Sequence, residues 1–118
     1  MIRLLLALVC SVALIGCGPS ESGGRDAKFT IAFSQCNSAE PYRTAQNAIM
    51  REAIKQYDDC ELVIQDAQQD NAKQIAQIEN FILQGVDVLI VAPNEAAPLT
   101  AVVKEARAKG IKVVCLER

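Results

Sequence analysis

Polar side chains that could bind a ligand follow each of four short apolar segments of the chain. They combine amides, an acid, an aromatic ring and two arginines, and the candidate binding residues are Gln35, Asn37, Tyr42, Arg43, Asn94, Glu117 and Arg118. Amide and carboxylate oxygens accept hydrogen bonds from hydroxyl groups, whereas a guanidinium donates in a fixed fork. An aromatic ring such as that of Tyr42 adds an apolar face with a polar tip. This combination suits a ligand that carries several hydroxyl groups.

Each candidate also has a purely structural explanation. Asp70 or Asn71 can cap the helix predicted after them, and Asn94 can cap the next one. Arg118 can be a solvated charge at the end of the chain, and polar loops are common in all proteins. The candidates therefore carry weight only as a set.

Several classes of chemistry are disfavoured by what the sequence lacks. It contains no histidine, which removes Ser-His-Asp and Cys-His catalysis and the commonest metal ligand. It has no Cys-x-x-Cys pair for zinc, no G-x-G-x-x-G after the first apolar segment and no phosphate-binding P-loop. Twelve basic residues stand against fourteen acidic ones, without a basic stripe for nucleic acid. We expect a binding module with no catalytic residues, cofactor, metal site or nucleic-acid partner; a flavodoxin-like enzyme would need a nucleophile or cofactor loop.

Strand and helix patterns alternate along the chain and would position the candidate residues. Apolar runs predict strands over residues 28–34, 61–65, 86–92 and 111–116. Helices are predicted over 41–57, 71–84 and from 95 or 98 to 109, with Gly85 and Gly110 after the last two. For the first helix, the spacing of four between Ala45, Ile49, Ala53 and Tyr57 predicts the inward face.

This alternation predicts an α/β fold, a three-layer αβα open parallel sheet with helices on both faces. Ligands of such sheets bind outside the carboxyl ends of the strands, where the candidate residues lie. The chain has 118 residues, which suits one small domain. No helix follows the last strand to cover its part of the sheet, so we expect a fragment of a longer protein.

The first residues have the pattern of an export signal. Arg3 precedes an apolar and small-residue run from Leu4 to Ile15, which is shorter than the roughly 20 residues of a membrane-spanning helix. Leu14-Ile15-Gly16-Cys17 resembles the lipobox of bacterial lipoproteins, which implies lipidation of Cys17; an ordinary signal ending near a small residue is the alternative. We predict a lipoprotein signal peptide over 1–16 and a lipidated cysteine with a flexible Gly- and Ser-rich tether over 17–27.

Three cysteines remain after the predicted signal and the lipidated position, namely Cys36, Cys60 and Cys115. An odd number excludes a complete disulfide framework. Cys36 and Cys60 are expected at opposite ends of neighbouring strands, roughly 15 Å or more apart and beyond the disulfide reach of about 7 Å between Cα atoms. We expect three unbridged thiols.

Residues 28–118 resemble the N-terminal lobe of ribose-type periplasmic sugar-binding proteins, the type 1 periplasmic binding proteins, whose fold lac-repressor-type regulators share. The galactofuranose-binding branch is the most similar at the first strand. The motifs that carry the resemblance are Phe33-Ser34-Gln35, Tyr42-Arg43, Asp66-x-Gln68, Gln84-Gly85-Val86-Asp87, Ala92-Pro93 and Glu117-Arg118. A repressor would carry an N-terminal helix-turn-helix, where this chain has an export signal.

The resemblance implies a two-lobed protein that closes on one monosaccharide and delivers it to an ABC transporter permease or a membrane receptor. Tyr42-Arg43 and Glu117-Arg118 would contact the sugar, and Asn94 would line the same pocket. The family has Asp where this chain has Glu117, which is one methylene longer. The chain would be held in the cell envelope or periplasm by its lipid anchor. The alternative is the ligand-sensing input domain of a membrane signalling protein, which a membrane helix and kinase after Arg118 would distinguish.

Overall fold

The computed structural model describes residues 29–116, which alternate strictly between strand and helix. The elements in chain order are β1 (Phe29–Gln35), α1 (Pro41–Ile54), β2 (Cys60–Asp66), α2 (Asn71–Gln84), β3 (Val88–Ala92), α3 (Ala96–Ala108) and β4 (Lys112–Cys115). The predicted signal peptide, Cys17 with its tether, Glu117 and Arg118 lie outside the described residues. Within residues 29–116, no helix is long and apolar enough to cross a membrane.

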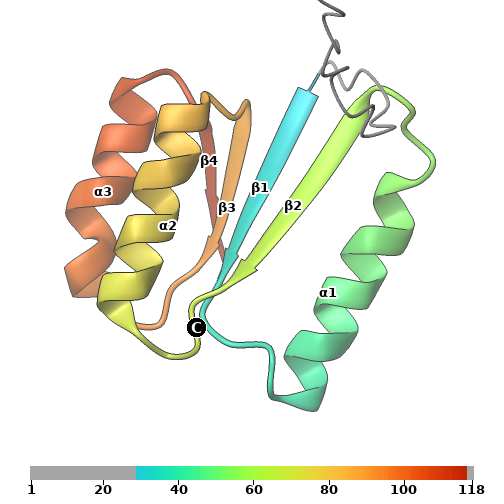
Figure 1. The fold of residues 1–118 in the computed structure, drawn as a ribbon, viewed down its shortest axis with the longest axis horizontal. Coiled ribbons are helices and arrows are strands. Elements are labelled where there is room, and N and C mark those ends of the chain that lie inside the picture. Colours follow the sequence, from blue (N-terminus) through green and yellow to red (C-terminus); the bar gives the residue numbers. More distant parts are fainter. Residues whose placement is uncertain (1–28, 117–118) are drawn as a thin grey trace, which may run out of the picture.

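The four strands form one parallel sheet in the order β2-β1-β3-β4. Helix α1 lies on one face of the sheet, and α2 and α3 lie side by side on the other (Figure 1). The predicted three-layer αβα open parallel sheet is therefore confirmed. Because all strands run in one direction, the loops that leave their carboxyl ends gather at a single edge of the sheet.

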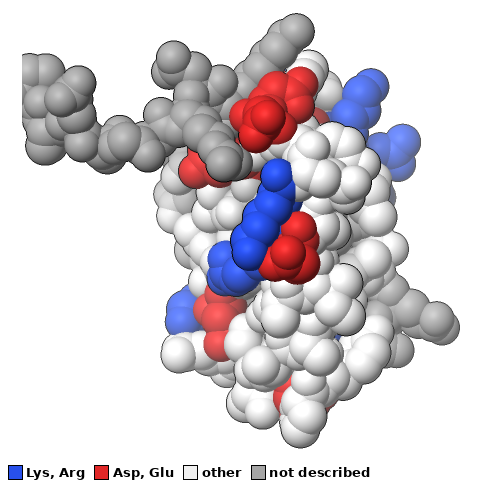
Figure 2. All heavy atoms as spheres, turned by 90° about the vertical axis from the view of Figure 1, so that its right-hand side faces the viewer, with Lys and Arg blue, Asp and Glu red and all other residues white. Residues whose placement is uncertain are grey.

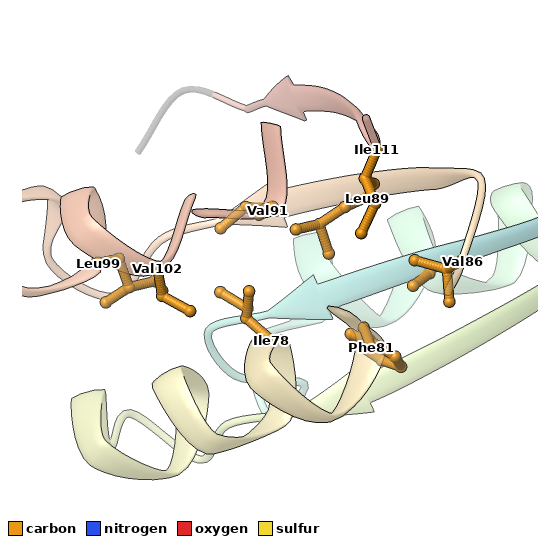
Figure 3. Packing of buried hydrophobic residues seen from close by; sticks show 10 residues of the cluster. Ile78, Phe81, Val86, Leu89, Val91, Leu99, Val102 and Ile111 are labelled. Atoms are coloured by element: carbon orange, nitrogen blue, oxygen red, sulfur yellow. The ribbon is translucent and has the colours of Figure 1, made fainter. Parts of the chain in front are cut away.

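The main hydrophobic core lies between the sheet and the pair α2 and α3 (Figure 3). Ile78 and Phe81 of α2 are fully buried there, together with Leu89 of β3 and Leu99 of α3. The spacing of the apolar residues in these two helices predicts inward faces, and that prediction is confirmed because all of these residues lie in the core or pack against it: Ile75, Ile78, Ile82, Leu99, Val102, Val103 and Ala106. Gly85 ends α2 with φ of 69°, a left-handed conformation that glycine adopts without a Cβ clash, so this predicted stop is also confirmed.

The inward face predicted for the first helix is wrong. Helix α1 ends at Ile54, three residues before Tyr57, and none of its residues is buried. Ile49 is 68% exposed and Tyr57 is 52% exposed. The partly buried residues of α1 are instead Arg43, Gln46, Asn47, Met50 and Ile54. Most of them are polar because they meet a buried polar side chain of β1, so a search for an apolar stripe could not find this face.

The cysteines of the described chain are unpaired. Cys36, Cys60 and Cys115 are free, and Cys36 follows the end of β1 while Cys60 begins β2 at the opposite edge of the sheet. The length of β1 separates these two by roughly 20 Å. Partial burial and, after it, the neighbouring charge of Asp59 raise the pKa of the Cys60 thiol, which donates to Asp59 Oδ1 at 3.6 Å. Both effects favour the protonated thiol over the thiolate.

Candidate functional site

The carboxyl ends of β1, β2 and β3 meet at one edge of the sheet. Gln35, the last residue of β1, is in register with Asp66 of β2 on one side and with Ala92 of β3 on the other. A polar hollow of about 280 Å³ opens beside this edge, and the residues that line it are Asn37, Ser38, Ala39, Asp66, Gln68 and Gln69. Of the predicted binding residues that the structure describes, Asn37 lines this hollow, and Gln35, Tyr42, Arg43 and Asn94 do not.

Gln35 is completely buried and holds the side chain of Arg43. Its Oε1 accepts a hydrogen bond from Arg43 Nη1 at 2.8 Å. Its Nε2 donates to two residues of α1, to Gln46 Oε1 at 2.9 Å and to Asn47 Oδ1 at 3.2 Å. Both polar atoms of Gln35 are occupied within the protein, so the structure places Gln35 behind Arg43 and not at a ligand-accessible surface.

Arg43 lies in the first turn of α1, and its side chain is 14% exposed. Its Nε lies 3.5 Å from Glu40 Oε2 in an ion pair, and this buried nitrogen has no hydrogen-bond partner among the described residues. The first turn begins at Pro41, whose fixed φ suits a helix start where no N–H partner is needed. Arg43 is thus a cation fixed at the predicted site edge with a small accessible surface.

Tyr42 lies apart from the polar hollow. It is 71% exposed and lines an apolar groove of about 400 Å³ between α1 and the uncovered face of β3 and β4, together with Ile90, Val114 and Leu116. Tyr42 and Asn37 therefore do not share one hollow in the described chain. Adjacent positions on a helix point about 100° apart, which explains why Tyr42 and Arg43 separate.

Asn37 and Asn94 both use their side chains to hold loops. Asn37 is 6% exposed, and its Oδ1 accepts from the backbone N–H of Ala39 at 3.2 Å. The Nδ2 of Asn94 donates to Gln69 O at 3.1 Å and to Asn71 Oδ1 at 2.9 Å. Asn94 therefore links the end of β3 to the start of α2, and its Oδ1 is the side-chain atom left for a ligand.

Of the two helix caps offered as structural explanations, the structure confirms the one for α2 and contradicts the one for α3. Asp70 is the N-cap of α2, and its Oδ1 accepts from Lys73 N at 3.0 Å, so this structural explanation is confirmed. Asn94 does not cap α3, because the N-cap of that helix is Glu95, without a side-chain cap bond. The prediction that Asn94 caps the helix is therefore wrong.

Sequence reasoning missed Gln74, a fully buried amide in the first turn of α2. Its Nε2 donates to Ser34 Oγ at 3.1 Å and to Ala92 O at 3.0 Å, and its Oε1 accepts from Asn94 N at 2.9 Å. Gln74 thereby joins β1, β3 and the Asn94 loop. The sequence feature that could have indicated this role is a single amide side chain, Gln74, on the inward apolar face of α2 beside Ile75 and Ile78.

The turn between β2 and α2 also has an unusual backbone. Gln68 and Gln69 have φ of 55° and 62°, values that residues with a Cβ rarely adopt. Asp66 Oδ1 accepts from Gln68 N at 2.8 Å, and Cys36 O accepts from Gln69 N at 2.8 Å. The turn is thus fixed from both neighbouring strands, and this fixed turn forms one wall of the polar hollow.

The chemistry available at this edge is that of recognition. The described residues contain no group of three histidine, cysteine or acidic side chains that could hold a metal ion.

Over the α1 face, basic and acidic side chains are interspersed (Figure 2), and Lys55 pairs with Glu52 at 2.6 Å. Amides, one cation and nearby carboxylates can donate to and accept from a neutral polar ligand.

A family model for a periplasmic binding protein domain matches residues 31–118. The chain belongs to the periplasmic binding protein domain family. Relatives with similar sequences confirm the predicted resemblance to ribose- and galactofuranose-type binding proteins. The chain is 35% identical to the ribose import binding protein of Bacillus subtilis over 101 residues, covering 85% of this chain and 32% of the relative. It is 35% identical to the galactofuranose-binding protein of Escherichia coli, covering 98% of this chain and 34% of the relative.

Solved periplasmic binding proteins agree with the fold. A solute-binding protein of Bacillus halodurans with bound myo-inositol superposes with a TM-score of 0.73 at 32% identity, over 80% of this chain and 33% of that one. The chain spans about one third of the length of the relatives it matches. These relatives are binding proteins, which agrees with the prediction that this periplasmic binding protein domain is not an enzyme.

Proposed function

We propose that this chain is the first lobe of a protein that captures a monosaccharide for an ABC sugar importer. The observation that carries the proposal is the fixed cation Arg43, which is anchored on Gln35 at the carboxyl edge of the sheet, the edge at which the polar hollow opens. Relatives named for ribose, galactofuranose and xylose support a sugar as the ligand class. The ligand-binding residues of this lobe are Asn37, Arg43 and Asn94, joined by Tyr42, Glu117 and Arg118, with Gln35 behind Arg43.

A second lobe completes the site in this proposal. The polar hollow is open to solvent, whereas binding pockets bury about 70–90% of a small ligand. The matched relatives are about three times as long as the chain, which leaves room for such a lobe. The two-lobe protein is this chain together with the second lobe that the proposal expects.

The test is to measure the melting temperature of the two-lobe protein in the presence of each ligand of a panel. Neutral pentoses, hexoses and inositol are compared with amino acids and sugar phosphates at equal concentration. At 100 times its Kd, a true ligand adds about 2.7 kcal/mol to stability, so the expected shift is several degrees. A shift with an amino acid and none with any sugar or polyol would contradict the proposal.

The proposal includes a lipid anchor at Cys17. Two or more acyl chains on this residue would give lasting membrane attachment, because each buried CH₂ contributes about 0.8 kcal/mol. In a bacterial host, labelled palmitate is expected in the wild-type chain and absent from Cys17→Ala, which should fractionate away from membranes. The Cys10→Ala variant is the control and should stay labelled. Equal labelling of Cys17→Ala and wild type would refute the anchor.

A second candidate function is ligand sensing by a membrane signalling protein. One solved relative is the fructose-binding periplasmic domain of a hybrid two-component system, with a TM-score of 0.73 and 37% identity over 76% of this chain. Both functions use the same lobe and the same edge. The sequence encoded after Arg118 separates them, because a sensor would add a membrane helix and a kinase after its second lobe.

A further inference from the structure

We infer that Gln35 is a positioning residue that fixes the guanidinium of Arg43 toward the ligand. The inference rests on the proposed sugar-binding function. Gln35 is a strand residue with no exposed surface, so it can affect a ligand only through another side chain. Arg43 is the side chain that it meets, at 2.8 Å between Gln35 Oε1 and Arg43 Nη1.

The direction of the hydrogen bonds around Gln35 determines which of its atoms faces Arg43. Arg43 donates to Gln35, Gln35 Nε2 donates to Asn47 Oδ1, and Asn47 Nδ2 donates to Ser38 Oγ at 3.1 Å. Gln35 Nε2 also donates to Gln46 Oε1 at 2.9 Å. A rotated Gln35 amide would place its own N–H groups against the guanidinium, where no acceptor exists. The amides of α1 therefore keep the acceptor oxygen of Gln35 turned toward Arg43.

This arrangement fixes the plane of the guanidinium before a ligand arrives. Nη1 donates to Gln35. Nε is buried and lies 3.5 Å from Glu40 Oε2 in an ion pair, without a hydrogen bond, so Gln35 is the hydrogen-bonding anchor of the guanidinium among the described residues. Among the described residues, Nη2 has no hydrogen-bond partner and is the nitrogen left for a ligand. Ordering a long side chain in advance reduces the entropy that binding must remove. The mixed polar face of α1 thus has a functional explanation as the support of Arg43.

The test is a double-mutant cycle on sugar affinity in the two-lobe protein, measured by isothermal titration. Gln35→Leu is expected to raise Kd about 10- to 30-fold, because a charge-assisted hydrogen bond is lost. Gln35→Glu keeps an acceptor oxygen for Arg43 but loses the donations to Gln46 and Asn47, so it should weaken binding less than Gln35→Leu, by about 3- to 10-fold. In an Arg43→Ala background, Gln35→Leu should cause no further loss. Gln77→Leu is the control. Gln77 is a partly buried glutamine of α2 whose side chain donates to Asp66 O and not to Arg43, so this variant should leave Kd unchanged.

A second variant covers the case in which Gln35→Leu does not fold. Asn47→Ala interrupts the same chain of hydrogen bonds from the surface of α1 with a good helix former. It should weaken binding about 3- to 10-fold in wild type, and not at all in Arg43→Ala. Unchanged affinity in both variants, or equal losses with and without Arg43, would overturn the inference.

An NMR measurement made without sugar distinguishes a failure of this inference from a failure of the proposed function. In NMR spectra of the chain itself, the Arg43 Nε–H signal should be sharp in wild type and broadened or shifted in Gln35→Leu, with the backbone signals of β3 unchanged. If no sugar binds the wild-type two-lobe protein, the proposed function fails while this signal still reports on Gln35. An unchanged Arg43 signal in a folded Gln35→Leu chain would refute the positioning role.

Discussion

Replacing Gln74 by leucine is expected to lower the free energy of unfolding by about 3 kcal/mol. The leucine side chain is one bond shorter and has no polar atom, so it leaves Ser34 Oγ, Ala92 O and Asn94 N without the partner that Gln74 gives them. Gln74 has no exposed surface, so water cannot replace these bonds at no cost. The melting temperature should fall by roughly 10–20 °C for a domain of this size. Chemical denaturation followed by circular dichroism measures the loss directly.

The matched control is Gln77→Leu, one turn further along α2. Among the described residues, the side chain of Gln77 donates one hydrogen bond, from Nε2 to Asp66 O at 3.0 Å, and its Oε1 is buried without a hydrogen bond. Removing that unpaired oxygen offsets the lost bond, so the expected change is about 1 kcal/mol or less. Equal losses at positions 74 and 77 would mean that Gln74 does not join the strand ends as described.

Replacing Phe81 by alanine is expected to cost about 3–5 kcal/mol. Phe81 has no exposed surface and packs between α2 and the sheet with Ile78, Val86 and Leu89 (Figure 3). The variant removes buried apolar area and leaves a cavity that the surrounding strands cannot fully close. Since domains are stable by only about 5–15 kcal/mol, the variant should be partly unfolded at room temperature.

The control for this prediction lies two residues away on the same helix. Leu83 is 83% exposed, so Leu83→Ala should change the free energy of unfolding by less than about 0.5 kcal/mol. Urea titrations of both variants give the comparison. A Phe81→Ala chain as stable as wild type would contradict the position of the core between the sheet and the pair of helices.

Local sequence patterns were sufficient for most of the fold. The apolar spacing in α2 and α3 places Ile78 and Leu99 in the core because those faces meet a hydrophobic sheet. Gly85 marks the end of α2 because only its conformation at φ of 69° allows the turn. Alternation of strand and helix then leaves few parallel topologies, since crossovers are right-handed. These signals lie within one element and its neighbours.

The polar contacts could not be predicted in the same way. Gln74 donates a hydrogen bond to Ser34, which lies 40 residues earlier in the sequence, and no local sequence pattern predicts that pairing. The inward face of α1 is polar because Gln35 needs partners there, and an apolar stripe is the wrong signal for such a face. The site prediction assigns the candidate residues to the carboxyl edge of the sheet and stays a prediction. It did not separate residues that face a ligand from Gln35 and Gln74, which hold them.

The measurement that tests the central claim most directly is a pair of isothermal titrations with one neutral sugar. One uses the chain ending at Arg118 and the other uses the two-lobe protein. If this lobe supplies half of a closing site, the two-lobe protein should bind at micromolar Kd or better, and the single lobe at least about 100-fold more weakly. Micromolar binding by the single lobe, or an affinity of the two-lobe protein that Arg43→Ala does not weaken, would contradict the account.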